Sequence, residues 1–196
     1  FGIKLHPTLS VNFVEGFSDF KYKKLNILYN HPVFLGKYGV LNPTIIAGKA
    51  FNPLPLSLLY GVSANQTYFY APNTFALLNY YQFVADEFLQ LNVEQHFNGF
   101  IFNHIPILNK AKLRDVLFFR SYIGNISAGA NALNRSSIQY MKPFKPYIEY
   151  GFGIENIGFG NLRPLRIDFI WNNNIASKFS NPFPRFGIRF GFNTTF

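Results

Sequence analysis

The last eleven residues of the chain, 186–196, alternate between two kinds of side chain. Large apolar side chains stand at Phe186, Ile188, Phe190, Phe192 and Phe196, and the other positions hold glycine, arginine, asparagine or threonine. Because successive side chains of a strand point to opposite faces, this pattern predicts a β-strand with one apolar and one polar face. It is typical of a transmembrane β-barrel, whose strands are apolar toward lipid and polar toward the lumen. A soluble β-sandwich that ends in phenylalanine by chance is the alternative.

The terminal Phe196, preceded by apolar residues at alternate positions, resembles the signal that outer-membrane barrels present to the machinery that assembles them. The resemblance implies a bacterial outer-membrane location and the barrel assembly machinery as a partner during biogenesis. The five apolar residues of the last strand would then form an assembly signal and one side of a seam in the barrel.

Composition points the same way. Charged residues make up 14% of the chain, against roughly 25% in a typical soluble domain, whereas aromatic residues reach 19%. No stretch approaches the 18 or so consecutive apolar residues of a transmembrane helix. We therefore expect an all-β fold, a transmembrane antiparallel β-barrel, occupying residues 1–196 as one domain.

The formal net charge of +9 has two interpretations. Basic residues interleaved with aromatic ones can bind single-stranded nucleic acid. Here the aromatic residues fall on the strand faces opposite the charges, so we prefer lumenal charge and contacts with phosphate-rich headgroups. The expected partners are outer-membrane lipid and lipopolysaccharide, and no nucleic acid.

Alternation and turn residues divide the chain into eight or nine predicted strands. They cover approximately residues 1–14, 21–30, 40–51, 56–63, 83–97, 113–126, 146–156, 165–171 and 186–196. Residues 64–80, 127–142 and 172–184 lack a clear period and are predicted to be external loops, because barrels place their long loops outside. Residues 113–126 are apolar on both faces, so the pattern does not orient that strand.

Charged residues at inward positions of the last two strands form the candidate site. Arg166 and Asp168 share the inward face of the penultimate strand, and Arg189 lies on the inward face of the last one. We expect a lumenal charge network, because buried charges must be paired. His96 shares a strand face with Glu94, which suggests an acid–base pair or, preferably, a hydrogen-bonding pair of the lumen.

Sequence signatures of catalysis and metal binding are missing. The chain has no cysteine, no HxxxH or HExxH pair and no GxSxG elbow. Outer-membrane hydrolases use serine with histidine and asparagine, or aspartate with histidine, but Ser127, Ser136 and Ser137 have no histidine nearby. We therefore predict no catalytic residue, no metal and no cofactor, with an outer-membrane hydrolase kept as a minor alternative.

Several segments of the second half occur in a familiar order. They are residues 112–119 (KLRDVLFF), the glycine-alternating residues 150–154 (YGFGI), residues 163–169 (RPLRIDF) and the phenylalanine-ending strand. This order resembles the carboxy-terminal strands of the BamA/TamA-type superfamily of outer-membrane assembly and transport barrels. Residues 75–81 and 96–106 are most similar to a divergent family typical of Bacteroidota, in which a carboxypeptidase-regulatory-like domain precedes a barrel of unknown function.

The resemblance implies a sixteen-stranded barrel of which this chain is the carboxy-terminal half, lacking amino-terminal strands and a periplasmic domain. It implies a role in outer-membrane protein assembly or translocation, alone or in a complex with other outer-membrane proteins or lipoproteins. The superfamily's inward-folding loop usually carries an Arg-Gly-Phe/Tyr tripeptide, which the corresponding residues 65–80 lack. A free-standing eight-stranded barrel with a structural or adhesive role is the alternative.

Overall fold

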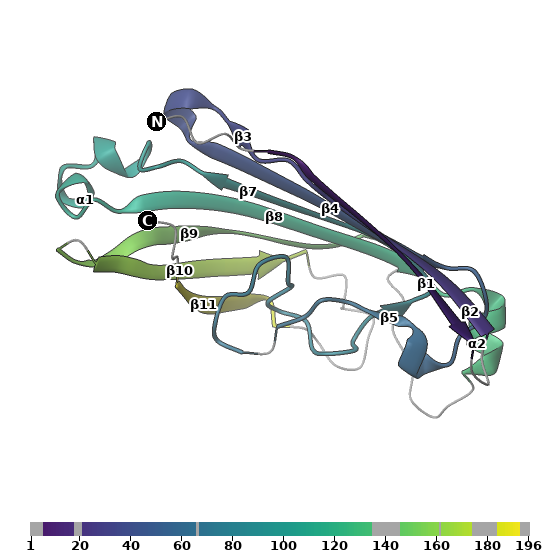
Figure 1. The fold of residues 1–196 in the computed structure, drawn as a ribbon. Coiled ribbons are helices and arrows are strands. Elements are labelled where there is room, and N and C mark those ends of the chain that lie inside the picture. Colours follow the sequence, from purple (N-terminus) through teal and green to yellow (C-terminus); the bar gives the residue numbers. More distant parts are fainter. Residues whose placement is uncertain are drawn as a thin grey trace.

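The computed structural model describes residues 6–17, 21–65, 67–134, 146–160, 162–173 and 184–192, with the side chain of Phe159 left out. Within them, eight long strands form one antiparallel sheet in which each strand pairs with the next in chain order (Figure 1). These strands are β1 (Thr8–Phe17), β2 (Lys21–Asn30), β4 (Val40–Ala50), β7 (Glu87–His96), β8 (Arg114–Asn125), β9 (Tyr147–Phe159), β10 (Leu162–Asn172) and β11 (Phe186–Phe192).

The remaining elements are short. β3 (Val33–Phe34) pairs with the start of β4, and β5 (Tyr60–Gly61) pairs with β6 (Val84–Ala85) in a separate two-stranded sheet. The helical turns are η1 (Gly36–Tyr38), η2 (Leu56–Leu58), η3 (Phe102–His104), α1 (Pro106–Lys110) and α2 (Ala128–Leu133). No helix in the described ranges combines the length and the hydropathy needed to cross a bilayer.

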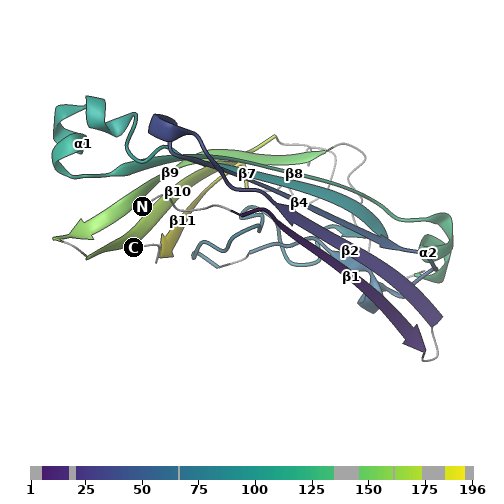
Figure 2. The ribbon, with the colours of Figure 1, turned by 45° about the horizontal axis from the view of Figure 1, so that its top comes forward.

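The sheet is open. β1 and β11 lie at its two edges, and no pairing joins them among the described residues (Figure 2). The fold is thus all-β and antiparallel, as predicted, but the described strands do not close on one another. The two longest connections, after β4 and after β8, leave the sheet at one end, and the connection after β7, which contains η3 and α1, leaves it at the other.

The two faces of the sheet differ in chemistry. On β10, Arg166, Asp168 and Ile170 are buried, whereas Leu165 on the opposite face is exposed. The same alternation runs through β7, β8 and β9, and it orients the strand that the sequence left ambiguous. Val116, Phe118 and Tyr122 of β8 are buried on the inner face, and Leu117, Phe119 and Ile123 are exposed on the outer face. We call the buried side the inner face and the apolar, exposed side the outer face.

Aromatic rings on the outer face form a cluster across the last three strands. Phe152 of β9 stacks on Phe169 of β10, with the ring centroids 4.9 Å apart, and on Trp171 at 6.0 Å. Trp171 in turn contacts Phe186 of β11 at 5.0 Å. Packed aromatic pairs of this kind add to sheet stability, so the cluster ties β11 to the two strands before it.

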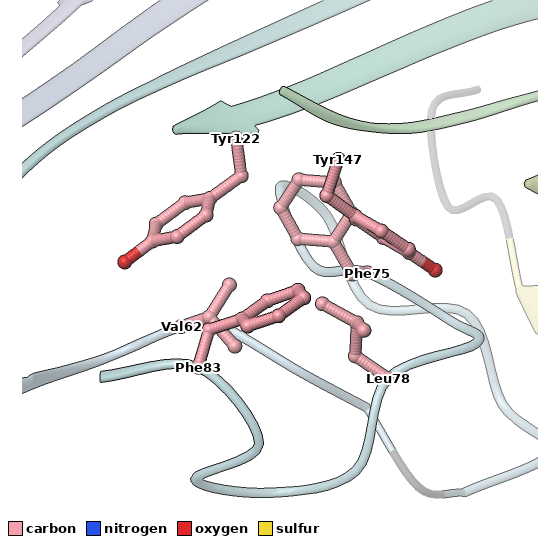
Figure 3. Packing of buried hydrophobic residues seen from close by; sticks show 6 residues of the cluster. All are labelled: Val62, Phe75, Leu78, Phe83, Tyr122 and Tyr147. Atoms are coloured by element: carbon pink, nitrogen blue, oxygen red, sulfur yellow. The ribbon is translucent and has the colours of Figure 1, made fainter. Parts of the chain in front are cut away.

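The inner face is covered by the chain between β4 and β7. We call residues 67–83 of this connection the inner strap. Its buried side chains Phe75, Leu78 and Phe83, with Val62 just before it, pack against Tyr122 of β8 and Tyr147 of β9 (Figure 3). Ring centroids within the cluster lie 5.5–6.3 Å apart, and Phe75 has no exposed surface. The strap therefore shares a hydrophobic core with the sheet.

The predictions for this region hold only in part. The described part of residues 64–80 contains no long strand, as predicted for a loop, but Phe75 and Leu78 within it pack on Tyr122 and Tyr147 beneath the sheet. Residues 56–63 are not a strand of the main sheet: they form η2 and the short β5, and Leu59 and Val62 are buried in the cores beneath the sheet. Phe196 and most of the other two predicted loops lie outside the described residues.

Truncating Phe75 to alanine should destabilise the protein by about 3–5 kcal/mol, because it leaves a cavity in a fully buried aromatic cluster. The measurement is the urea-unfolding midpoint of the full-length protein in detergent. Tyr68→Ala, in the same strap but 74% exposed, is the control and should change stability by less than about 1 kcal/mol. Equal losses from the two variants would contradict the assignment of Phe75 to a core.

Candidate functional site

A carboxylate of β7 lies at the centre of the inner face. The Arg120 guanidinium of β8 donates to Glu94 Oε1 at 2.8 Å, and the Arg166 guanidinium of β10 donates to Glu94 Oε2 at 3.3 Å. All three side chains are buried. Glu94 of β7 thereby links β8 to β10, the two strands that flank β9 in the sheet.

The network continues through Arg166. Its Nη1 donates to Glu155 Oε1 of β9 at 3.1 Å, and its Nε donates to Asp168 Oδ1 at 2.7 Å. His96 lies between two acids, with Nδ1 3.1 Å from Glu155 Oε2 and Nε2 3.5 Å from Glu94 Oε2. Three carboxylates, two guanidinium groups and one imidazole thus face one another, and we call these six side chains the inner charge network.

A tyrosine of the inner strap covers the network on the side away from the sheet. The Tyr70 hydroxyl donates to both oxygens of Glu94, at 3.0 and 3.2 Å, and its ring lies 4.3 Å from the Arg166 guanidinium. Burial, followed by the negative charge of Glu94, raises the pKa of the Tyr70 hydroxyl, so this group stays protonated and remains a donor. The strap is therefore attached to the charges of the sheet and not only to its hydrophobic core.

A second carboxylate holds the strap by its backbone. Glu149 of β9 has no exposed surface, and its two oxygens accept hydrogen bonds from the backbone N–H groups of Ala76 and Leu77, at 2.9 and 2.8 Å. The Tyr147 hydroxyl donates to the same carboxylate at 2.8 Å. These bonds offset the cost of burying the carboxylate and fix residues 76–77 beside β9.

Glycines make the space that the network needs. A Cβ atom on Gly153 of β9 would lie 2.3 Å from Asp168 Oδ1, and one on Gly151 would lie 2.6 Å from the ring of Phe118. Both positions are on the inner face, so the alternating glycines of β9 admit large side chains from β8 and β10. The glycine alternation seen in the sequence therefore has a packing cause.

The structure brings only part of the predicted network together. Arg166 and Asp168 are in contact, but Arg189 forms no ion pair with a carboxylate in the described part of the chain. Its guanidinium donates instead to the backbone oxygens of Ala76 in the strap and Ile188 in its own strand. Arg189 thus contacts the strap, whose position the sequence does not indicate, in place of a carboxylate of the described residues.

The four described apolar residues of the last strand face outward. Phe186, Ile188, Phe190 and Phe192 are all exposed on the outer face of β11, at one edge of the sheet. The remaining member of the predicted set, Phe196, lies outside the described residues.

Sequence reasoning paired Glu94 with His96, which lie 3.5 Å apart, but it did not identify Glu94 as the hub, and it missed three other members of the site: Arg120, Glu155 and Tyr70. The period-two pattern already put Glu94 and Glu155 on polar faces, but it gave no strand register with which to pair them. The network joins groups up to 72 residues apart, such as Glu94 and Arg166. In the described ranges no group of three or more histidine, aspartate or glutamate side chains is arranged to hold a metal ion.

Replacing Glu94 by glutamine should destabilise the protein by about 3–5 kcal/mol, because it removes the negative charge that both buried guanidinium groups share. The measurement is again the urea-unfolding midpoint of the full-length protein in detergent.

Glu87→Gln on the same strand is the matched control. Glu87 pairs with Lys49 at 3.1 Å, but both side chains are largely exposed, so this substitution should cost about 0–1 kcal/mol. If Glu94→Gln were as mild as Glu87→Gln, the inner charge network would not be holding the strands together.

Comparison with known proteins identifies the family. The model described as family of unknown function (DUF5686), C-terminal domain, matches residues 2–154. The match spans β1 to β8, the inner strap and most of β9, and it includes Tyr70, Glu94, Arg120 and Glu149. Searches of curated proteins and of solved structures found no match. Because the matched residues make up more than half of its length, the chain belongs to this family of unknown function, DUF5686, as its C-terminal domain.

Proposed function

We propose that the chain forms part of an outer-membrane β-barrel, the carboxy-terminal half of a sixteen-stranded barrel that acts in outer-membrane protein assembly or translocation, alone or in a complex. The observation that carries the proposal is the inverted polarity of the sheet. Apolar side chains are exposed on the outer face of every long strand, and charged side chains are buried on the inner face of β7 to β10. This arrangement suits a sheet whose outer face meets lipid and whose inner face meets a polar lumen.

The open edges support a larger barrel. An eight-stranded barrel would require β1 to pair with β11, whereas these strands are the two ends of the described sheet. Unpaired strand edges are unfavourable in a bilayer, where no water satisfies backbone N–H and C=O groups. Further strands joined to the free edge of β1 would widen the barrel and bring its first strand to β11, where the two ends would meet at a seam.

The inner strap supports the link to assembly and transport barrels. The BamA/TamA-type superfamily, which the sequence resembles, has a loop that folds back into its barrel. The residues that correspond to that loop form the strap, which here folds onto the inner face of the sheet; it lacks the superfamily's tripeptide and is attached through Tyr70 and through Glu149. On this proposal the chain has a mechanical role, in which the β11 edge pairs with a strand of another outer-membrane protein.

The barrel itself is tested with single cysteines on β1, since the 196 residues contain none of their own. We expect a fluorophore attached at Val11 or Phe13, on the outer face, to be quenched by lipids with brominated acyl chains. A fluorophore at Ser10 or Asn12, on the inner face, should not be quenched. All four positions are exposed and tolerate a label. Equal quenching at adjacent positions would contradict a lipid-facing outer surface.

The assembly role is tested at the β11 edge. A photo-crosslinking amino acid replaces Ile188 in the full-length protein, expressed in its own outer membrane while other barrels are being made. We expect adducts with newly synthesised outer-membrane proteins. The same group at Leu117, on the outer face of the interior strand β8, should react only with lipid. Adducts at Ile188 confined to the protein's own chain would argue for a sealed barrel without this role.

A further inference from the structure

The strap reaches the free edge of the last strand. β11 pairs with β10 along one edge, and at its other edge the strap residues flanking Phe69 bond to Phe190. The Phe190 N–H donates to the Tyr68 oxygen at 2.7 Å, and the Tyr70 N–H donates to the Phe190 oxygen at 2.5 Å. These are the backbone groups that a neighbouring strand would need. We call residues 67–70 the strap tip.

The direction of this pairing differs from that of the sheet. The bridge between Phe69 and Phe190 is parallel, whereas every pair of neighbouring long strands is antiparallel. A strand that continued the sheet beyond β11 in the same up-and-down order would be antiparallel to β11. The strap tip therefore occupies the hydrogen-bonding groups of Phe190 without being the next antiparallel strand of the sheet. While it is bound there, an antiparallel strand cannot pair with Phe190.

The inner face of β11 is shaped to receive the strap. A Cβ atom on Gly187 would lie 2.6 Å from Leu77 Cδ2, and one on Gly191 would lie 3.0 Å from Tyr70 Cβ. The guanidinium of Arg189, between these glycines, donates to the Ala76 carbonyl. Glycine, arginine and glycine thus alternate along the strand as contact points for the strap.

The tip is less firmly held than the rest of the strap. Tyr68 and Phe69 are 74% and 58% exposed, whereas Phe75, Leu77 and Leu78 are buried. Next to the tip, a cavity of about 520 Å³ is bounded by Tyr68 and Leu77 on one side and by residues 186–190 of β11 on the other. Besides its backbone bonds, the tip is held by the Phe69 ring, stacked on Phe192 with the centroids 6.2 Å apart, and by the Tyr70 hydroxyl on Glu94. These contacts must break for the tip to leave β11, whereas the buried residues 75–78 can stay in place.

We infer that the strap tip is an intramolecular plug on the strand-pairing edge of β11, and that it must leave Phe190 before an incoming strand can pair there. The partner is an amphipathic antiparallel β-strand of a client outer-membrane protein, apolar on the side that continues the outer face of β11. The inference rests on the proposed function, and it adds the contact that regulates the access of a client strand to the edge of β11.

A disulfide lock tests the plug. Phe69→Cys and Phe190→Cys place two cysteines at bridge partners, which lie within disulfide range across adjacent strands. In the full-length protein in its own membrane, this pair should oxidise readily. The control pair, Phe69→Cys with Phe13→Cys on β1 at the opposite edge of the sheet, should not. Client adducts at a photo-crosslinker on Ile188 should fall at least tenfold in the oxidised protein and return after reduction.

Tyr70→Phe supplies the opposite perturbation. It removes the hydrogen bond that the Tyr70 hydroxyl shares between the two oxygens of Glu94, and the population with a released tip and the yield of client adducts at Ile188 should rise about tenfold. Tyr68→Phe, which changes the same atom on an exposed ring of the strap tip, should leave the yield unchanged.

The outcomes separate the plug from the proposed function. Failure of the Phe69–Phe190 pair to oxidise would overturn the plug, as would client adducts that form equally in the locked and reduced protein. The second result would leave the assembly role intact. Absence of client adducts in every variant, Tyr70→Phe included, would overturn the proposed function together with the plug.

Discussion

The structure depends on the pairing of charges that the sheet buries. Glu94 accepts hydrogen bonds from Arg120, Arg166 and Tyr70, which come from β8, β10 and the inner strap. An unpaired charge at this depth would cost several kcal/mol, so each of these elements restricts the position of the others. The register of β7 to β10 and the placement of the strap therefore follow from a single requirement. The neighbouring carboxylate of Glu149 meets the same requirement with backbone N–H groups in place of cations.

The outer face of the sheet differs from the inner face in what it exposes. Its apolar side chains leave much of their surface without a protein partner, for example 47% at Leu117 and 62% at Phe192, and the sheet hides polar groups on its other face. In water such a surface would favour aggregation, and the two open edges would add to the hazard. In a bilayer it is the expected exterior of a barrel. On the proposed membrane location, the network inside and the exposed apolar surface outside are two consequences of one change of solvent.

Much of this could be predicted from the sequence, because side chains of a strand alternate whatever they contact. The period-two pattern placed Gln90, Asn92 and Glu94 on one face of β7, and Ile167 and Phe169 opposite Asp168 on β10. Contacts between distant strands could not be read in this way. Asp168 and Arg189 are register partners in β10 and β11, yet Asp168 bonds to Arg166 and Arg189 bonds to the strap. Residues 64–80 have no period, and their position depends on Tyr122 and Tyr147, which lie far along the chain.

The aromatic cluster on the outer face has an optical consequence. Trp171 is the one tryptophan in these 196 residues, and it contacts Phe152 and Phe186 on the strands either side of its own. Its indole is half-buried between two neighbours that belong to separate strands. The emission of this residue therefore depends on β9, β10 and β11 being in register, and on the solvent that meets them. The chain carries its own spectroscopic reporter of the position of β11.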